Sequence, residues 1–140
     1  SQDIECVAKD DPVFDHISFA VADFARSREF YTRALAPLGY KMLKNVDLTD
    51  ETGEGGYAGF GDDTPRFWIG TGQPMTGSLH LAFVAKDRDM VRDFYEAALA
   101  AGAKDNGLPG LRPHYHANYY GAFVIDPDGH NIEAVCHLPE

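Results

Sequence analysis

Two stretches of the chain, HISFAVADFARSREFYTRALA (His16–Ala36) and HLAFVAKDRDMVRDFYEAALA (His80–Ala100), are copies of one another. The offset between them is 64 residues throughout, and nine of the 21 aligned positions are identical. A repeat at a fixed period indicates a duplicated structural unit. We therefore expect one domain, 1–140, made of two modules, the first at about 13–70 and the second at about 77–137.

Each copy is expected to open with a strand, at Phe14–Val21 and Leu79–Val84, because bulky and small side chains alternate there. The bulky set suits packing beneath a helix. The opposite face carries His16 in the first copy and His80 in the second, each beside mostly small side chains. The two histidines therefore stand at equivalent positions with open space beside them.

A helix is expected after each strand. Asp23 and Asp87 are good N-cap residues, because a carboxylate accepts the free N–H groups of the first turn. Gly39 and Gly102 lie just past the helices, where glycine adopts the left-handed conformation at little cost. The further strands are expected at Tyr40–Val46, Tyr57–Gly61, Phe67–Gly70, Ala103–Asp105, Tyr119–Ile125 and Asn131–His137.

The last two strands are joined by the turn DPDG (Asp126–Gly129), and His130 just after it is expected at the surface. Glu133 then alternates onto the same open side as His16 and His80. Two histidines and one carboxylate are a ligand set that suits Fe²⁺, Mn²⁺, Zn²⁺ or Ni²⁺ better than calcium. The alternative is that the histidines are duplicated strand residues and that the glutamate is a partly exposed one.

The paired units, the helix motif SREFYTRALA and the closing DPDGHNIE resemble the vicinal oxygen chelate superfamily, from about Val13 to His137. That group includes glyoxalase I, extradiol dioxygenases, fosfomycin-resistance enzymes, methylmalonyl-CoA epimerase and bleomycin-binding proteins. The resemblance implies an α+β fold in which two βαβββ modules form a curved mixed sheet, a cup that holds a divalent metal ion. It places His16, His80 and Glu133 at ligand positions, and it implies a homodimer that acts on a small molecule.

A fourth ligand position separates the branches of that superfamily. Glyoxalase I and the epimerase carry a carboxylate on a strand of the first module, where metal-bound glutamates act as bases. Subtracting 64 from Glu133 gives Ile69, with Trp68 beside it, and the segment RFWIGTG holds no carboxylate. The extradiol dioxygenases and the fosfomycin-resistance enzymes use the remaining His-His-Glu set. The spacing from His116 to the DPDG turn matches theirs, but Phe123 stands where they have a tyrosine.

The segment NGLPGLRPHYHAN, residues 106–118, is long for a connection and rich in glycine and proline, and such loops are often functional. Arg112, Tyr115 and His116 are candidate catalytic residues within it, since they could reach an anionic or hydroxylated ligand. His116 is the best general acid or base, because imidazole exchanges protons near neutral pH. The alternative is that they are solvated or make a dimer contact. Tyr119 is expected to be a wall or core aromatic residue.

The composition excludes some classes of function. The net charge is −10 and the 12 Lys and Arg residues are scattered, which argues against nucleic acid. The acidity is typical of a chain kept soluble by self-repulsion, and the alternative is that it suits a cationic ligand. No apolar run is long enough to span a membrane, the first residues do not read as a signal peptide, and a cytoplasmic location is expected.

Three hypotheses of function stay open. The first is a metal-dependent enzyme that chelates a small oxygen-bearing substrate, either a lyase or isomerase or an extradiol-type dioxygenase. The second is a metal-free protein that binds a small molecule such as an antibiotic, like the bleomycin-resistance branch. The third is a glyoxalase I-like lyase or epimerase that uses a different base for the missing fourth ligand.

Overall fold

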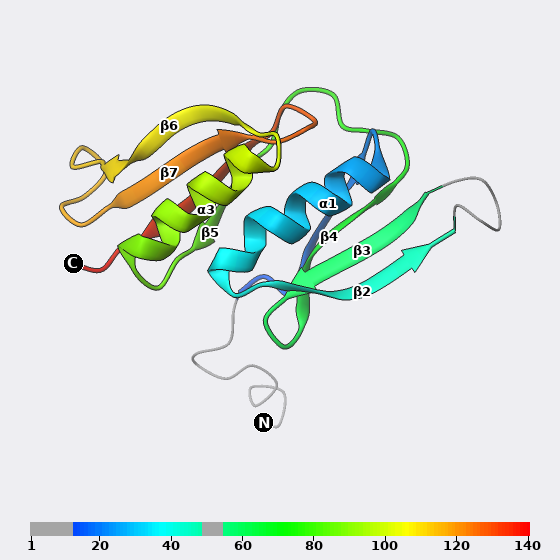
Figure 1. Ribbon diagram of the computed structural model, residues 1–140, viewed down its shortest axis with the longest axis horizontal. Helices are drawn as coiled ribbons and strands as arrows, with labels where there is room; N and C mark the ends of the chain where they lie inside the picture. Colours follow the sequence, from blue (N-terminus) through cyan, green and yellow to red (C-terminus); the bar gives the residue numbers. More distant parts are fainter. Residues whose placement is uncertain (1–12, 49–54) are drawn as a thin grey trace, which may run out of the picture.

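The computed structural model describes residues 13–48 and 55–140. The order of elements is that of two βαβββ modules (Figure 1). The elements are β1 (Ile17–Val21), α1 (Phe24–Leu35), the 3₁₀ helix η2 (Ala36–Leu38), β2 (Lys41–Asp47), β3 (Gly56–Gly61), β4 (Pro65–Thr71), β5 (His80–Val84), α3 (Arg88–Ala100), β6 (Lys104–Leu111), β7 (Tyr120–Ile125) and β8 (Asn131–Cys136). No helix in the described ranges is long and apolar enough to cross a bilayer.

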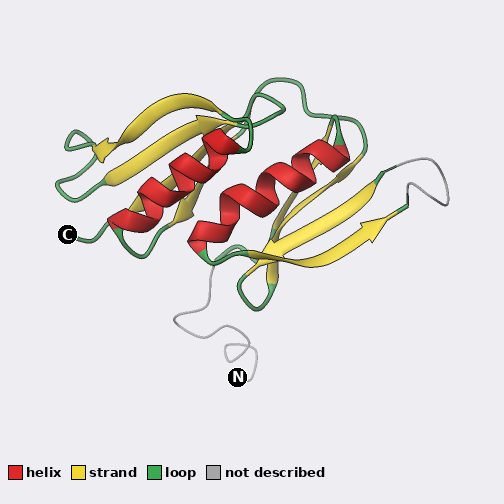
Figure 2. Cartoon of the chain, in the orientation of Figure 1, coloured by secondary structure: helices red, strands yellow, loops and turns green. Residues whose placement is uncertain are grey.

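Each module forms its own four-stranded mixed sheet. The strand orders are β1-β4-β3-β2 and β5-β8-β7-β6. The first strand of each module runs parallel to the last, with Ile17 opposite Phe67 in one sheet and Leu81 opposite Ile132 in the other. The remaining pairs are antiparallel. The predicted α+β fold of two equivalent modules is therefore confirmed, and Figure 2 shows the two sheets with the helices lying along one side.

The two long helices begin where the sequence predicts. Asp23 and Asp87 each accept a hydrogen bond from the backbone N–H three residues further on, at 3.1 and 2.8 Å. Gly39 and Gly102 follow the helical segments with φ of 85° and 106°, which side chains other than glycine rarely adopt. The repeated Asp and Gly positions thus fix the ends of both helices.

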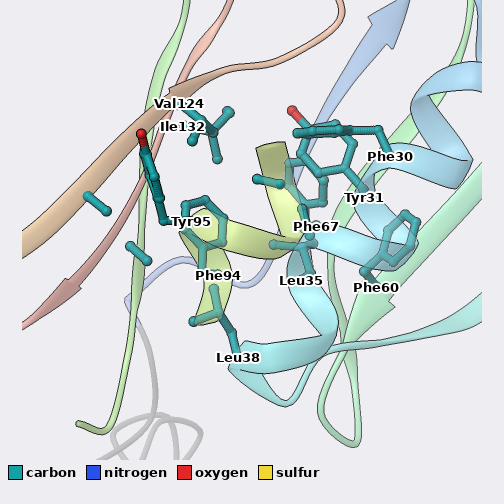
Figure 3. Packing of buried hydrophobic residues seen from close by; sticks show 14 of the residues in the cluster. Phe30, Tyr31, Leu35, Leu38, Phe60, Phe67, Phe94, Tyr95, Val124 and Ile132 are labelled. Carbon is teal, nitrogen blue, oxygen red and sulfur yellow. The ribbon is translucent and has the colours of Figure 1, made fainter. Parts of the chain in front are cut away.

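A single hydrophobic core joins the two modules (Figure 3). Helices α1 and α3 lie side by side and contact each other. Phe30 and Leu35 of the first helix and Phe94 of the second are fully buried, in one continuous cluster with residues from both sheets such as Phe60 and Ile132. Burial on this side leaves the opposite face of each sheet free to carry function.

A buried hydrogen bond also connects the modules. Tyr31 on α1 donates its hydroxyl hydrogen to the carboxylate of Asp126, in the turn that precedes β8. The same carboxylate accepts the backbone N–H groups of Asp128 and His130, at 2.9 and 2.8 Å. Burial, together with the neighbouring Asp126, raises the pKa of Tyr31 well above its usual value. The turn motif therefore anchors the first module as well as closing the last hairpin.

His130 is buried, with 2% of its surface exposed, so the prediction that it lies at the surface is wrong. Its Nδ1 accepts the backbone N–H of Leu79 at 3.0 Å, and its ring meets the ring of Phe19 edge-on, with 5.2 Å between centroids. The cause is tertiary: the seam between the modules passes over the turn, which the sequence pattern of one hairpin does not reveal.

Strand β6 is longer than predicted. It runs to Leu111 and takes in the first half of the segment 106–118 that the sequence marks as a loop. Its pairing with β7 is irregular, with shifts of register on both sides of Gly107. Because β6 is an edge strand, the missing N–H of Pro109 and these irregularities are tolerated.

The seam between β1 and β5 separates the two first-strand histidines. At one end, His16 lines a cleft together with Val84 from the end of β5. At the other end, Ala22 just past β1 donates its N–H to Asp128 at 3.0 Å, in the turn that leads into the strand residue paired with His80. The strands therefore lie in opposite directions, and the two histidines stand at opposite ends of the seam.

Candidate functional site

Glu133 is the centre of the candidate site. It lies in β8 and is fully buried, which is expensive for a carboxylate unless it has partners. One of its oxygens, Oε1, is 2.8 Å from Nε2 of His80, whose side chain is about half exposed. The register places the pair, because Glu133 lies opposite Ala82, two residues along β5 from the histidine. The structure therefore brings His80 and Glu133 together on one face of the second sheet.

Tyr119 holds the other oxygen of this carboxylate, through a hydrogen bond from its hydroxyl to Oε2 of Glu133. Burial, and then this bond, raise the pKa of Tyr119 above its usual value, so the hydroxyl stays a donor at neutral pH. Sequence reasoning placed the residue only as a wall aromatic. The sequence does hold a signal for this contact, the alternation of side chains that leads into β7. Tyr119, Gly121 and Phe123 share the face of Glu133, and the missing side chain of the glycine leaves room for the tyrosine to reach the carboxylate.

The fit is close at that glycine. A Cβ at Gly121 would lie 3.3 Å from both Oε2 of Glu133 and the ring of Tyr119. Phe123, directly opposite Glu133 in β7, forms the wall beside His80, with 6.2 Å between their rings. The carboxylate of Glu133 is thus surrounded by aromatic rings and small residues. A ligand or ion can reach it from one direction only, the side of His80.

His16 is not part of this pair. Its side chain is about half exposed, and its Nδ1 lies 2.7 Å from Oδ2 of Asp15. The hydrogen bond with His16 lowers the pKa of that aspartate. Within the described residues, no three His, Cys, Asp or Glu side chains come close enough to hold one ion. One chain therefore brings together two of the three predicted ligands and leaves the third at the far end of the seam.

His116 from the predicted catalytic loop pairs with a second histidine. Its Nε2 lies 2.6 Å from Nδ1 of His137, and the two rings are stacked. The backbone N–H of Asn118 donates to Nδ1 of His116, so the ring hydrogen is on Nε2 and points at His137. Both rings pack against the ring of Tyr119. The loop therefore brings a proton-sharing pair next to the residue that binds Glu133.

Arg112 and Tyr115, the other two predicted catalytic residues, lie near the same cluster. The guanidinium of Arg112 donates to the carbonyl oxygens of Gly110 and Leu108, at 2.9 and 2.7 Å, and lies over the ring of Phe123. Tyr115 is largely exposed and packs against Tyr119. Arg112 thus fixes the loop against the wall of the pocket.

The position in the first module that corresponds to Glu133 is occupied by Trp68. Ser18 pairs with Trp68 in the first sheet, and Ala82, 64 residues later, pairs with Glu133 in the second. Ile69, which the constant offset gives, points into the core instead and is 1% exposed. The first module therefore has no carboxylate at the position equivalent to Glu133, as the sequence predicts. The residue at that position is Trp68 on the open face, and not Ile69.

The fold and the site together define a class of protein. Its members have two βαβββ modules around a shared core and carry histidine and carboxylate side chains on the open face of the sheets. The match to known families agrees with this. A family model described as the Glyoxalase/Bleomycin resistance protein/Dioxygenase superfamily matches residues 13–134, and the chain belongs to that superfamily.

The chain is also similar to individual proteins of this superfamily. The lactoylglutathione lyase GLX1 of Arabidopsis thaliana is 30% identical over 97% of this chain, which spans about half (48%) of that relative's length. A glyoxalase/bleomycin resistance protein from Albidiferax ferrireducens matches in structure with a TM-score of 0.73 at 26% identity, over 91% of this chain and 100% of that one. A glyoxalase I variant from Zea mays matches with a TM-score of 0.61 at 26% identity, over 87% of this chain and 46% of that one.

Proposed function

We propose that the chain is a metal-dependent enzyme of the glyoxalase/dioxygenase superfamily, which binds a small oxygen-bearing substrate on a divalent ion held by His80, Glu133 and His16. The observation that carries the proposal is the buried carboxylate of Glu133 beside Nε2 of His80. The two side chains lie within hydrogen-bond distance, 2.8 Å, and neighbouring donors on one six-coordinate ion, each at about 2.0–2.2 Å, lie only slightly further apart. An ion in place of the shared proton would supply a Lewis acid that polarises a substrate oxygen.

The residues around the pair support this role. Tyr119 orients the carboxylate from behind, as the partners of metal ligands generally do, and leaves Oε1 free to face the histidine. Phe123 and the buried backbone of β7 exclude water from one side. We assign general acid or base action to His116, because its pairing with His137 provides a second nitrogen to take up or return a proton.

The third ligand is expected to come from a second copy of the chain. His16 and His80 lie at opposite ends of the seam, so a symmetric dimer would bring each His16 to the other chain's pair and would form two sites. Phe14 and Val84, next to His16, are 74% and 75% exposed. Apolar side chains with so much exposed surface favour a protein–protein interface at this place.

The lyase reaction of the plant relatives is a second candidate, since the identity extends over nearly the whole chain. Trp68 stands against it, because the position equivalent to Glu133 lacks the second carboxylate that such a site would use as a base. We therefore propose a metal-dependent enzyme of the superfamily that chelates an oxygen-bearing substrate, and we keep the glyoxalase I-like lyase reaction as the alternative.

Metal content tests the ligand assignment. Protein without an affinity tag is stripped with a chelator, exposed in turn to Fe²⁺, Mn²⁺, Zn²⁺ and Ni²⁺, dialysed, and subjected to elemental analysis. We expect about one ion per chain, and less than about a tenth of that in His80→Ala and Glu133→Gln, since the donor set is lost. His114→Ala, an exposed histidine of the same module, is the matched control. Full occupancy in His80→Ala would overturn the assignment, and no uptake by the wild type would favour the metal-free binding protein.

Mixing two defective chains tests the shared site. His16→Ala and Glu133→Gln variants are unfolded together, refolded together and assayed for bound metal. A mixed dimer has one site with all three ligands and one with two defects, so metal binding should return to about one ion per mixed dimer. Refolding each variant alone is the control. A site built within one chain predicts no recovery.

A further inference from the structure

The segment from Asp105 to Gly107 interrupts the pairing of strand β6 with β7. Asp105 lies opposite Val124 and Gly107 lies opposite Phe123, so Asn106 has no residue opposite it. Such an extra residue is a β-bulge, which leaves the ladder of hydrogen bonds incomplete and lets the strand bend. Because β6 is an edge strand, Asn106 is also exposed to water. Its side chain therefore lies outside the packed part of the sheet.

Glycine follows Asn106, and the fold requires glycine at this position. A Cβ at Gly107 would lie 2.8 Å from Cδ1 of Phe123 and 3.2 Å from a guanidinium nitrogen of Arg112. The missing side chain also leaves the backbone nitrogen of Gly107 open to the side chain that precedes it. Asn106 is the only asparagine of the chain with this neighbour. The other three asparagines precede valine, tyrosine and isoleucine, and they are Asn45, Asn118 and Asn131.

The backbone N–H of Gly107 has a base beside it. It donates to Oδ1 of Asp105, with 2.9 Å between the nitrogen and the oxygen. The hydroxyl of Tyr95 donates to the same oxygen at 3.0 Å, so the carboxylate is held in place from helix α3. General base catalysis requires a base within hydrogen-bond distance of the proton that it removes. Three successive residues thus supply a base, a side-chain amide and a nucleophilic nitrogen.

We propose that Asn106 is a site of spontaneous modification, which loses its side-chain amide as ammonia with Asp105 as the base. The nitrogen of Gly107 attacks Cγ of Asn106 while Oδ1 of Asp105 takes up its proton. The C–N bond of the side-chain amide breaks, the proton passes to the departing nitrogen, and ammonia leaves behind a cyclic succinimide. Water then opens the ring at either carbonyl carbon, which gives aspartate or isoaspartate. No oxidant or reductant takes part, and the attack is intramolecular.

The product alters the surroundings of Phe123. Isoaspartate places an extra methylene group in the backbone of β6, directly before Gly107. Because Gly107 lies against the ring of Phe123 and the guanidinium of Arg112, a displaced backbone moves both groups. Either product also adds a negative charge next to Asp105. Since Phe123 forms the wall beside His80, the modification changes the open face of the second sheet from a position outside it.

Peptide mapping by mass spectrometry tests the proposal on the full chain, with a chelator present. The protein is incubated at mildly alkaline pH and sampled over several weeks. We expect the amide of Asn106 to be lost at least about tenfold faster than those of Asn118 and Asn131, which precede bulky residues. The ammonia released should equal the amide lost, and an isoaspartyl methyltransferase should label the product at position 106. Equal rates at the three asparagines would overturn the proposal.

Variants separate the base from the Asn-Gly sequence. Asp105→Ala should slow the loss of the amide about tenfold, since the base is removed. Asp93→Ala, at an exposed aspartate of α3, is the matched control and should keep the wild-type rate. Asn106→Ser should release no ammonia from this position, and circular dichroism verifies that each variant is folded. A wild-type rate in folded Asp105→Ala would overturn the role of the base. Because the chelator is present, a failure here is separate from a failure of the metal assignment.

Discussion

Glu133 shows how one side chain concentrates the chemistry of the second module. It is 0% exposed, yet both of its carboxylate oxygens have partners, His80 on one side and Tyr119 on the other. A buried carboxylate with donors on both oxygens is fixed in orientation, which is what a metal ligand requires. The His80 side remains accessible and the Tyr119 side does not, so the arrangement also sets the direction from which an ion can bind.

Removal of the Tyr119 hydroxyl tests this orientation. Tyr119→Phe leaves Oε2 of Glu133 buried without its donor, which should lower the free energy of unfolding by about 1–3 kcal/mol. Loss of an orienting partner should also weaken metal binding by about 10- to 100-fold. Urea unfolding and metal competition measure the two effects. Tyr115→Phe, which removes a hydroxyl from a more exposed ring of the same cluster, is the control, and equal behaviour of the two variants would contradict the role given to Tyr119.

At the scale of elements, the two modules are copies that differ in one hairpin. From Gly59 to its partner Trp68 there are nine residues (68 − 59), and from Phe123 to its partner Glu133 there are ten (133 − 123). The extra residue lies in the hairpin that contains the DPDG turn. A constant offset of 64 therefore aligns β1, α1 and β3 with their copies but misses by one in β4, and a shift by one residue moves a side chain to the other face.

The repeated N-caps should contribute measurably to stability. Asp87→Ala removes the acceptor for the N–H of Met90 in the first turn of α3. We expect the free energy of unfolding to fall by about 1 kcal/mol, in line with other capping aspartates. Asp93→Ala, an exposed site inside the same helix, should be neutral or slightly stabilising because alanine favours helix. Denaturant unfolding measures the free energy of unfolding of both variants. An equal change in the two would show that the side chain of Asp87 does not stabilise the start of α3.

At the scale of the whole molecule, the modules are held together by the shared core and by the bond from Tyr31 to Asp126. The turn that carries Asp126 also brings His130 under the seam. Because one core includes side chains of both helices and both sheets, the modules are expected to unfold together in a single transition.

Alkaline pH should weaken this connection. The pKa of Tyr31 is higher in the folded chain than its ordinary value of 10.0, so above pH 10 the unfolded chain loses a proton that the folded chain keeps. Its contribution to stability is therefore complete below pH 10 and is lost as the pH rises toward the folded pKa. Tyr31→Phe should cost about 1–3 kcal/mol at neutral pH and should make the decline above pH 10 shallower. Urea unfolding from pH 7 to 11.5 measures both, with Tyr57→Phe as the control, and an unchanged slope would contradict the assignment.

Much of the fold follows from the repeat. Alternation placed His16, His80 and Glu133 on the open faces, and the paired aspartates and glycines marked the ends of the helices, because these are local consequences of backbone geometry. The sequence did not reveal the length of β6, since an edge strand tolerates a proline and irregular pairing that read as a loop. It also missed Tyr119 and the burial of His130, both of which depend on contacts between elements far apart in the chain.

The sequence by itself determined that the chain is two βαβββ modules, each with a histidine at the head of its first strand, because period-two and helical patterns are properties of neighbouring residues. Only the tertiary structure decided how those histidines are used. The antiparallel seam separates His16 from His80, and the strand register pairs His80 with Glu133 and puts Trp68 where a second carboxylate would be. The physical reason is that register and packing depend on a shared core, which no single stretch of sequence contains.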